Sequence, residues 1–153
     1  MNNAYNTAIG LDVGDRKTQV CVMAKDGKSP KIVMEMAIPT TKEGLAKFLS
    51  TQDRSTPVAF ETGTHCRWMN EVAQELGFKT YVANPCRLRM ITESKTKNDV
   101  NDARMLARLA LLDPGLLHPV KLRGPEHQKM LNLHGARNLA VKQRTEAIVQ
   151  LRA

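Results

Sequence analysis

The chain has 153 residues, of which 42% are hydrophobic and 25% are charged, and its net charge is +8. This length suits one domain with a substantial core and leaves little room for a second full domain. We find no apolar run approaching about 18 residues, as a membrane span would need, and no N-terminal secretory pattern, so we expect a cytoplasmic protein.

The positive charge is concentrated in the second half of the sequence. Residues 1–78 contain nine Lys or Arg and nine Asp or Glu, whereas residues 79–153 contain fourteen and six, a difference equal to the whole excess. Such an excess favours a polyanionic partner such as nucleic acid, and a solvated basic face is the alternative. Aromatic residues make up only 4% of the chain, which argues against a base-stacking platform for single strands.

The first third of the chain predicts an antiparallel meander. Residues 5–13, 18–24 and 31–38 have the composition of strands, and short turns containing Gly14 and Gly27 separate them. Three consecutive strands joined by short turns pair with one another in order.

Helices and strands then alternate. We predict a helix that begins at a capping box, Thr40–Glu43, and ends near Ser50, and a second helix that ends at Gly77. Short apolar runs at residues 57–60, ending at Glu61, and at residues 78–83 predict two further strands.

The remaining residues are mostly helical in pattern. The predicted elements are a short helix at 85–91, a polar loop at 92–98, a helix from Asp99 to Leu112, a Pro- and Gly-rich connector at 113–125, and a helical segment at 126–153. The last segment has an apolar stripe and nothing of its own to bury it against. It therefore suits an oligomerisation or partner helix, or the start of a further domain.

This element order predicts an α/β fold with a mixed sheet flanked by helices, the ribonuclease H-like arrangement, followed by a long C-terminal helix. If the first strand is central and the strand ending at Glu61 is its parallel neighbour, Asp12 and Glu61 reach the same edge of the sheet. Ligands collect at the carboxyl ends of strands in open α/β sheets.

Four acidic residues are candidates for chemistry. Asp12 and Glu61 end two predicted strands, and Asp99 and Asp102 share one face of a predicted helix. Together they could bind magnesium, which prefers oxygen ligands, and two such ions stabilise both oxygens of an in-line phosphoryl transfer. Alternatively, Asp99 is an N-cap and Asp102 a partner of the helix dipole, and spacing alone leaves both interpretations open.

The three cysteines, Cys21, Cys66 and Cys86, are odd in number and form no C-x-x-C pair. This spacing does not suit a zinc site. We expect reduced, buried thiols.

Four motifs resemble those of the DEDD transposases of insertion sequences, a family that includes the pilin-gene invertases and the RNA-guided bridge recombinases. The motifs occur in the family's order across residues 7–112, and they are Ile9–Val13, Phe60–Gly63, Ala83–Pro85 and Lys97–Arg104. The N-terminal domain of this family is similar to the Holliday-junction resolvase RuvC. Four motifs in register are more specific than any one of them.

The resemblance implies that Asp12, Glu61, Asp99 and Asp102 are the catalytic tetrad and bind Mg²⁺ or Mn²⁺. It implies DNA strand cleavage and exchange within a dimer or tetramer, with a structured guide RNA. It also implies a RuvC-like domain at 1–112, a connector at 113–125 and the start of a coiled-coil-like segment at 126–153. The family's serine nucleophile is expected beyond residue 153, so we expect this chain to be inactive alone.

Basic residues flank the candidate site and are predicted to bind nucleic acid: Arg87, Arg89, Lys95, Lys97 and Arg104. Two alternatives to the recombinase remain. One is a RuvC-like nuclease selective for DNA junctions, which acts through metal-activated water. The other is a non-catalytic nucleic-acid-binding or assembly module, in which the acids only cap structure.

Overall fold

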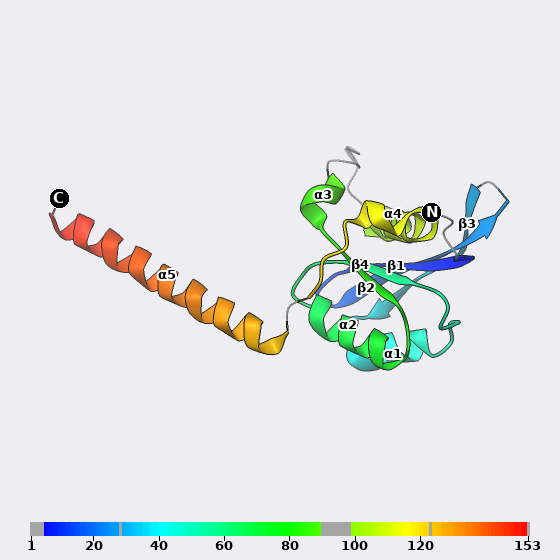
Figure 1. Cartoon of the computed structure of the whole chain (residues 1–153), viewed down its shortest axis with the longest axis horizontal. Coiled ribbons are helices and arrows are strands. Elements are labelled where there is room, and N and C mark those ends of the chain that lie inside the picture. The colour runs from blue at the N-terminus through cyan, green and yellow to red at the C-terminus, as the bar shows by residue number, and fades with distance from the viewer. Residues whose placement is uncertain (1–4, 28, 90–98, 123, 153) are drawn as a thin grey trace. The chain divides into compact units, whose positions relative to one another are not determined.

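The computed structural model of the chain describes residues 5–27, 29–89, 99–122 and 124–152 (Figure 1). The chain divides into two compact units, residues 1–121 and 122–153, and each is considered by itself. The predicted polar loop at 92–98, with Lys95 and Lys97, lies outside the described residues.

The first unit is built on a five-stranded mixed sheet in the order β3-β2-β1-β4-β5. The strands are β1 (Thr7–Val13), β2 (Lys17–Asp26), β3 (Ser29–Pro39), β4 (Val58–Glu61) and β5 (Thr80–Ala83). β1 pairs antiparallel with β2 and parallel with β4, and β4 pairs parallel with β5. The predicted meander, the central first strand and its parallel neighbour are therefore confirmed.

Helices cover both faces of this sheet. The helical segments of the chain are α1 (Lys42–Leu49), α2 (Cys66–Glu75), α3 (Pro85–Arg89), α4 (Asp99–Leu112), the 3-10 helix η1 (Pro114–Leu117) and α5 (Pro125–Arg152). α4 lies on one face of the sheet, and α1 and α2 lie on the other (Figure 1). This is the predicted ribonuclease H-like α/β arrangement.

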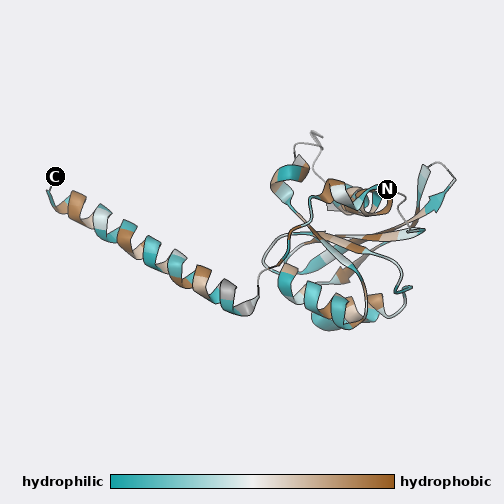
Figure 2. Cartoon of the chain, viewed as in Figure 1, coloured by the Kyte–Doolittle hydropathy of each residue, from teal (hydrophilic) through white to brown (hydrophobic). Residues whose placement is uncertain are grey.

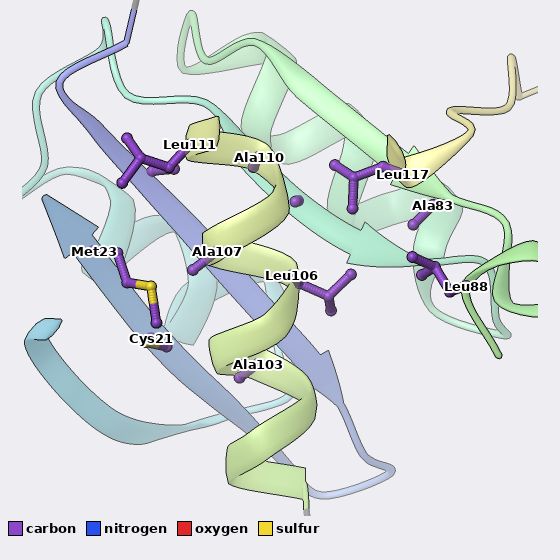
Figure 3. Packing of buried hydrophobic residues seen from close by; sticks show 12 residues of the cluster. Cys21, Met23, Ala83, Leu88, Ala103, Leu106, Ala107, Ala110, Leu111 and Leu117 are labelled. Atoms are coloured by element: carbon purple, nitrogen blue, oxygen red, sulfur yellow. The ribbon is translucent and has the colours of Figure 1, made fainter. Parts of the chain in front are cut away.

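The core beneath α4 contains many small side chains. Ala103 and Ala107 of α4 belong to one buried cluster with Ala8 of β1 and Ala59 of β4. The same cluster contains larger residues of α4, Leu106 and Leu111 (Figure 3). Small residues on both surfaces allow a helix to approach a sheet closely. The opposite face buries larger residues: Ile9, Leu11, Val20, Leu45, Phe48, Leu49, Phe60 and Met69.

The start of α1 differs from the predicted capping box. Thr41 is the N-cap, and its hydroxyl accepts the Gly44 N–H at 3.0 Å. The Thr40 hydroxyl instead donates to the Gly14 carbonyl at 2.9 Å and hydrogen-bonds with Thr18 at 2.9 Å. Thr40 therefore ties the end of β3 to the turn after β1 and is not available to cap α1.

The predicted connector at 113–125 contains ordered structure that the sequence pattern did not indicate. η1 brings Leu117 into the core, where it is fully buried. The Val120 N–H donates to the Val82 carbonyl at 2.9 Å, and the Asn84 N–H donates to the Leu117 carbonyl at 3.2 Å. These bonds hold the segment against β5.

The second unit is dominated by α5, which has 28 residues. Its side chains from residue 129 to residue 152 are all exposed, and hydrophilic and hydrophobic residues occur along its whole length (Figure 2). None of the described helices has the length and apolarity that a membrane crossing requires.

All three cysteines are free thiols, as expected, but only Cys21 is buried. Cys66 is half-buried and Cys86 is exposed on α3, so the expectation of burial was wrong for both. Burial, with the carboxylate of Glu35 nearby, raises the pKa of Cys21 to about 11. Cys21 is therefore an inert thiol of the core.

Candidate functional site

Two of the predicted site residues lie at the carboxyl ends of neighbouring parallel strands. Asp12 and Glu61 each come directly after one member of the parallel pair Leu11–Phe60, and both side chains are half-buried. Adjacent strands lie about 5 Å apart, so the two carboxylates occupy one short stretch of the sheet edge.

Both residues belong to the face of the sheet that α4 covers. Gly10 contacts α4 directly, and Asp12, two residues later in β1, lies on the same face because side chains alternate along a strand. Glu61 likewise follows Ala59 by two residues in β4 and so lies on the same face as Ala59, which belongs to the core beneath α4. The strand register therefore assigns both acids to the helix-covered face.

A contact between backbones fixes α4 over β1. A Cβ atom added to Gly10 would lie 2.1 Å from the Ala103 carbonyl oxygen and 2.4 Å from the Ala107 nitrogen. Only a residue without a side chain permits this approach. Asp102, which is half-buried, immediately precedes Ala103, and the N-terminal end of α4 lies toward the carboxyl end of β1 (Figure 3).

The first turn of α4 therefore lies toward the carboxyl end of β1, the strand that carries Asp12. Asp99 is the first residue of α4, but its side chain lies outside what the structure describes. Asp12, Glu61 and Asp102 are all described, but among the described residues no three His, Cys, Asp or Glu side chains form a group that could hold a metal ion, so the structure does not gather these acids into a metal site. The donors available here are carboxylate oxygens, which suit a hard divalent cation.

An ion pair links α4 to the edge strand β3. The guanidinium of Arg104 donates through Nη2 to Glu35 Oε2 at 2.8 Å and through Nε to Glu35 Oε1. This pair lowers the pKa of Glu35 and raises that of Arg104. Arg104, predicted to bind nucleic acid, is held by a carboxylate in this structure, and no spacing pattern could have indicated a partner 69 residues away.

The other predicted basic residues lie on or after α3. Arg87 is exposed on this helix. Arg89 ends it, but its side chain, like Lys95 and Lys97, is outside the described residues. Arg87 also lines an open pocket with Asn84, which lies in the Ala83–Pro85 motif, and with His118, which no sequence pattern indicated.

The strand order, the direction of the pairings and the placement of acids at the ends of β1 and β4 define a protein of the ribonuclease H-like class. The transposase family model DEDD_Tnp_IS110 matches residues 9–153, and the chain belongs to this family. No curated protein matches the chain. Family membership makes DNA the substrate and DNA recombination the process, and the family generally depends on divalent metal ions.

Proposed function

We propose that this chain carries the metal-dependent catalytic domain of a DNA transposase or recombinase. Asp12, Glu61, Asp99 and Asp102 are the proposed tetrad, and Mg²⁺ or Mn²⁺ is the proposed ion. The observation that carries the proposal is the backbone contact between Gly10 and α4. It supports the proposal because the helix turn with Asp99 and Asp102 directly precedes this contact, and the N-terminal end of α4 lies toward the carboxyl end of β1, where Asp12 lies.

The four acids supply what phosphoryl transfer needs from a protein. Their carboxylates would hold the cation, and the bound cation would neutralise charge on the scissile phosphate. Like charges gathered around one cation site would oppose one another when no cation is present. Binding of the ion should therefore stabilise the folded chain.

The proposed partners are DNA, a structured guide RNA and further copies of the chain. Arg87, Arg89, Lys95, Lys97 and Arg104 remain the proposed contacts to nucleic acid. The proposed nucleophile for strand exchange is a serine in a downstream domain, as the family resemblance implies.

Metal-dependent melting tests the tetrad without any need for catalysis. Mg²⁺ or Mn²⁺ should raise the Tm of the wild-type chain, because a ligand that binds only the folded state stabilises it. Asp12→Asn and Asp102→Asn should abolish the rise. Asp15→Asn, an exposed aspartate in the turn after β1, is the matched control and should keep it.

An unchanged metal response in Asp12→Asn and Asp102→Asn would exclude the tetrad assignment. A second measurement uses the full-length protein, in which either substitution should abolish recombination while the fold persists. Retained recombination would contradict the proposal even if metal binding were lost.

A further inference from the structure

An open pocket of about 430 Å³ lies just beyond the carboxyl end of β5. Asn84 and Arg87 form one wall, and a segment after α4 forms the other with Gly115, His118, Pro119 and Val120. Ala83, the last residue of β5, pairs with Glu61 of β4. The pocket therefore begins one strand away from a proposed metal ligand.

Hydrogen bonds join the two walls of this pocket. The Asn84 N–H donates to the Leu117 carbonyl at 3.2 Å, and the Val120 N–H donates to the Val82 carbonyl at 2.9 Å. Each wall is also anchored by a core residue, because Leu88 follows Arg87 and Leu117 precedes His118 (Figure 3). The two walls of the pocket are therefore fixed relative to each other by the core of the first unit.

The pocket presents hydrogen-bond donors and a positive charge. Asn84 Oδ1 accepts the Cys86 N–H at 3.1 Å, so its Nδ2 amide is the group left to donate to a ligand. Arg87 supplies an exposed guanidinium, and none of the six lining residues is acidic. This combination selects an anion.

The backbone at His118 adopts a conformation that L-residues rarely take. Its φ is +45°, in the left-handed region, and its N–H donates to the Gly115 carbonyl at 3.0 Å. Backbone outliers of this kind concentrate at binding and active sites. Here the turn holds the imidazole of His118 in the same pocket as Arg87.

We propose that Asn84, Arg87 and His118 bind a phosphate of the nucleic-acid backbone beside the carboxylate site. This inference rests on the proposed function, because it assumes that a nucleic-acid strand crosses Asp12 and Glu61. β5 lies two strand spacings, about 10 Å, from β1. At this separation the pocket would hold a phosphate within a few nucleotides of the scissile one.

The test is the affinity of the chain for labelled single-stranded DNA and for RNA of the same sequence, measured by fluorescence anisotropy in EDTA. Arg87→Gln should weaken binding about tenfold and reduce the slope of log K against log[salt] by about 0.7. His118→Asn should also weaken binding, and it preserves the fold because Asn tolerates the left-handed backbone.

Arg54→Gln is the matched control, since it removes the same charge from an exposed turn before β4, at the end of that strand opposite Glu61. Its affinity should equal that of the wild type. Equal affinities of wild type, Arg87→Gln and His118→Asn would overturn the proposal. So would a rise in Tm with inorganic phosphate that needs Arg87 while DNA and RNA affinities stay unchanged, because the pocket would then serve free phosphate.

The outcome can be separated from that of the proposed metal site. Arg87→Gln should retain the full Tm response to Mg²⁺. Weakened nucleic-acid binding without any metal response would support the pocket and contradict the tetrad. A normal metal response with unchanged nucleic-acid binding would support the tetrad and contradict the pocket.

Discussion

Gly10 shows how one residue can position two elements that carry proposed site residues. Its missing side chain lets the α4 backbone rest on β1, and the acids on both elements lie within two residues of that contact or in the adjoining helical turn. A side chain at this position would clash with the backbone atoms of Ala103 and Ala107, which cannot move aside as a flexible side chain can.

We therefore predict that Gly10→Ala destabilises the chain by about 3 kcal/mol, at the upper end of ordinary overpacking. Urea unfolding measures the change. Gly63→Ala is the control, because a Cβ there meets nothing within 4 Å, and it should cost less than about 0.5 kcal/mol. Equal stabilities of the two variants would mean that α4 can move away from β1 at little cost.

The roles of Asp12 and Glu61 were easier to predict from the sequence than the role of Gly10. Each ends an apolar run where a β-branched residue would pack better, which is a signal visible in the sequence. The importance of Gly10 could not be predicted, because it depends on a helix more than 90 residues later. Nor could His118, since its left-handed backbone arises only where η1 ends against β5.

At the level of elements, the position of α4 is secured at two places. The Gly10 contact holds it on β1, and the Arg104–Glu35 ion pair holds it to β3, two strands away. The second attachment depends on pH. Because Arg104 lowers the pKa of Glu35 in the folded state, the pair contributes stability above the unfolded pKa of Glu, about 4.3.

We predict that Glu35→Gln lowers stability at pH 7 and that its difference from the wild type shrinks as the pH falls below about 4.3. The direction follows because a depressed folded-state pKa makes protonation of Glu35 unfavourable to folding. Urea unfolding across this pH range measures it. Glu71→Gln, an exposed glutamate on α2, should show no such convergence, and a constant Glu35→Gln deficit at all pH values would contradict the role of charge.

The elements themselves were largely predictable. The alternation of apolar and polar residues, the turn residues and the helix stops predicted the five strands and α1, α2, α3, α4 and α5. These elements could be predicted because they depend mainly on local sequence patterns. η1 was missed, since prolines and glycines in residues 113–125 indicate a connector whether or not it packs. The N-cap of α1 was off by one residue, because the Thr40 hydroxyl is used by Gly14 and Thr18.

At the level of the whole molecule, the positive charge is divided evenly between two units of unequal size. Residues 1–121 contain seventeen Lys or Arg and thirteen Asp or Glu, and residues 122–153 contain six and two. Each unit therefore carries +4, but the second has far fewer residues. The charge density along α5 suits contact with a polyanion or with an acidic partner.

The nuclease alternative makes a distinct prediction for the intact chain. If strand exchange needs a serine from a downstream domain, residues 1–153 should bind branched DNA in Mg²⁺ without cutting it. Denaturing gels of labelled junctions measure this. Cleavage that Asp12→Asn abolishes and Asp15→Asn retains would favour a junction nuclease that uses activated water.

The contact at Gly10 also bears on how freely the rest of the core can vary. The spacing between α4 and β1 is set by main-chain atoms, which every amino acid shares, and not by the volumes of Leu111, Met23 or their neighbours. Substitutions among those side chains should therefore change the stability of the fold without moving the acids relative to one another. The relative positions of the proposed acids should therefore tolerate changes in the core side chains far better than a side chain at Gly10.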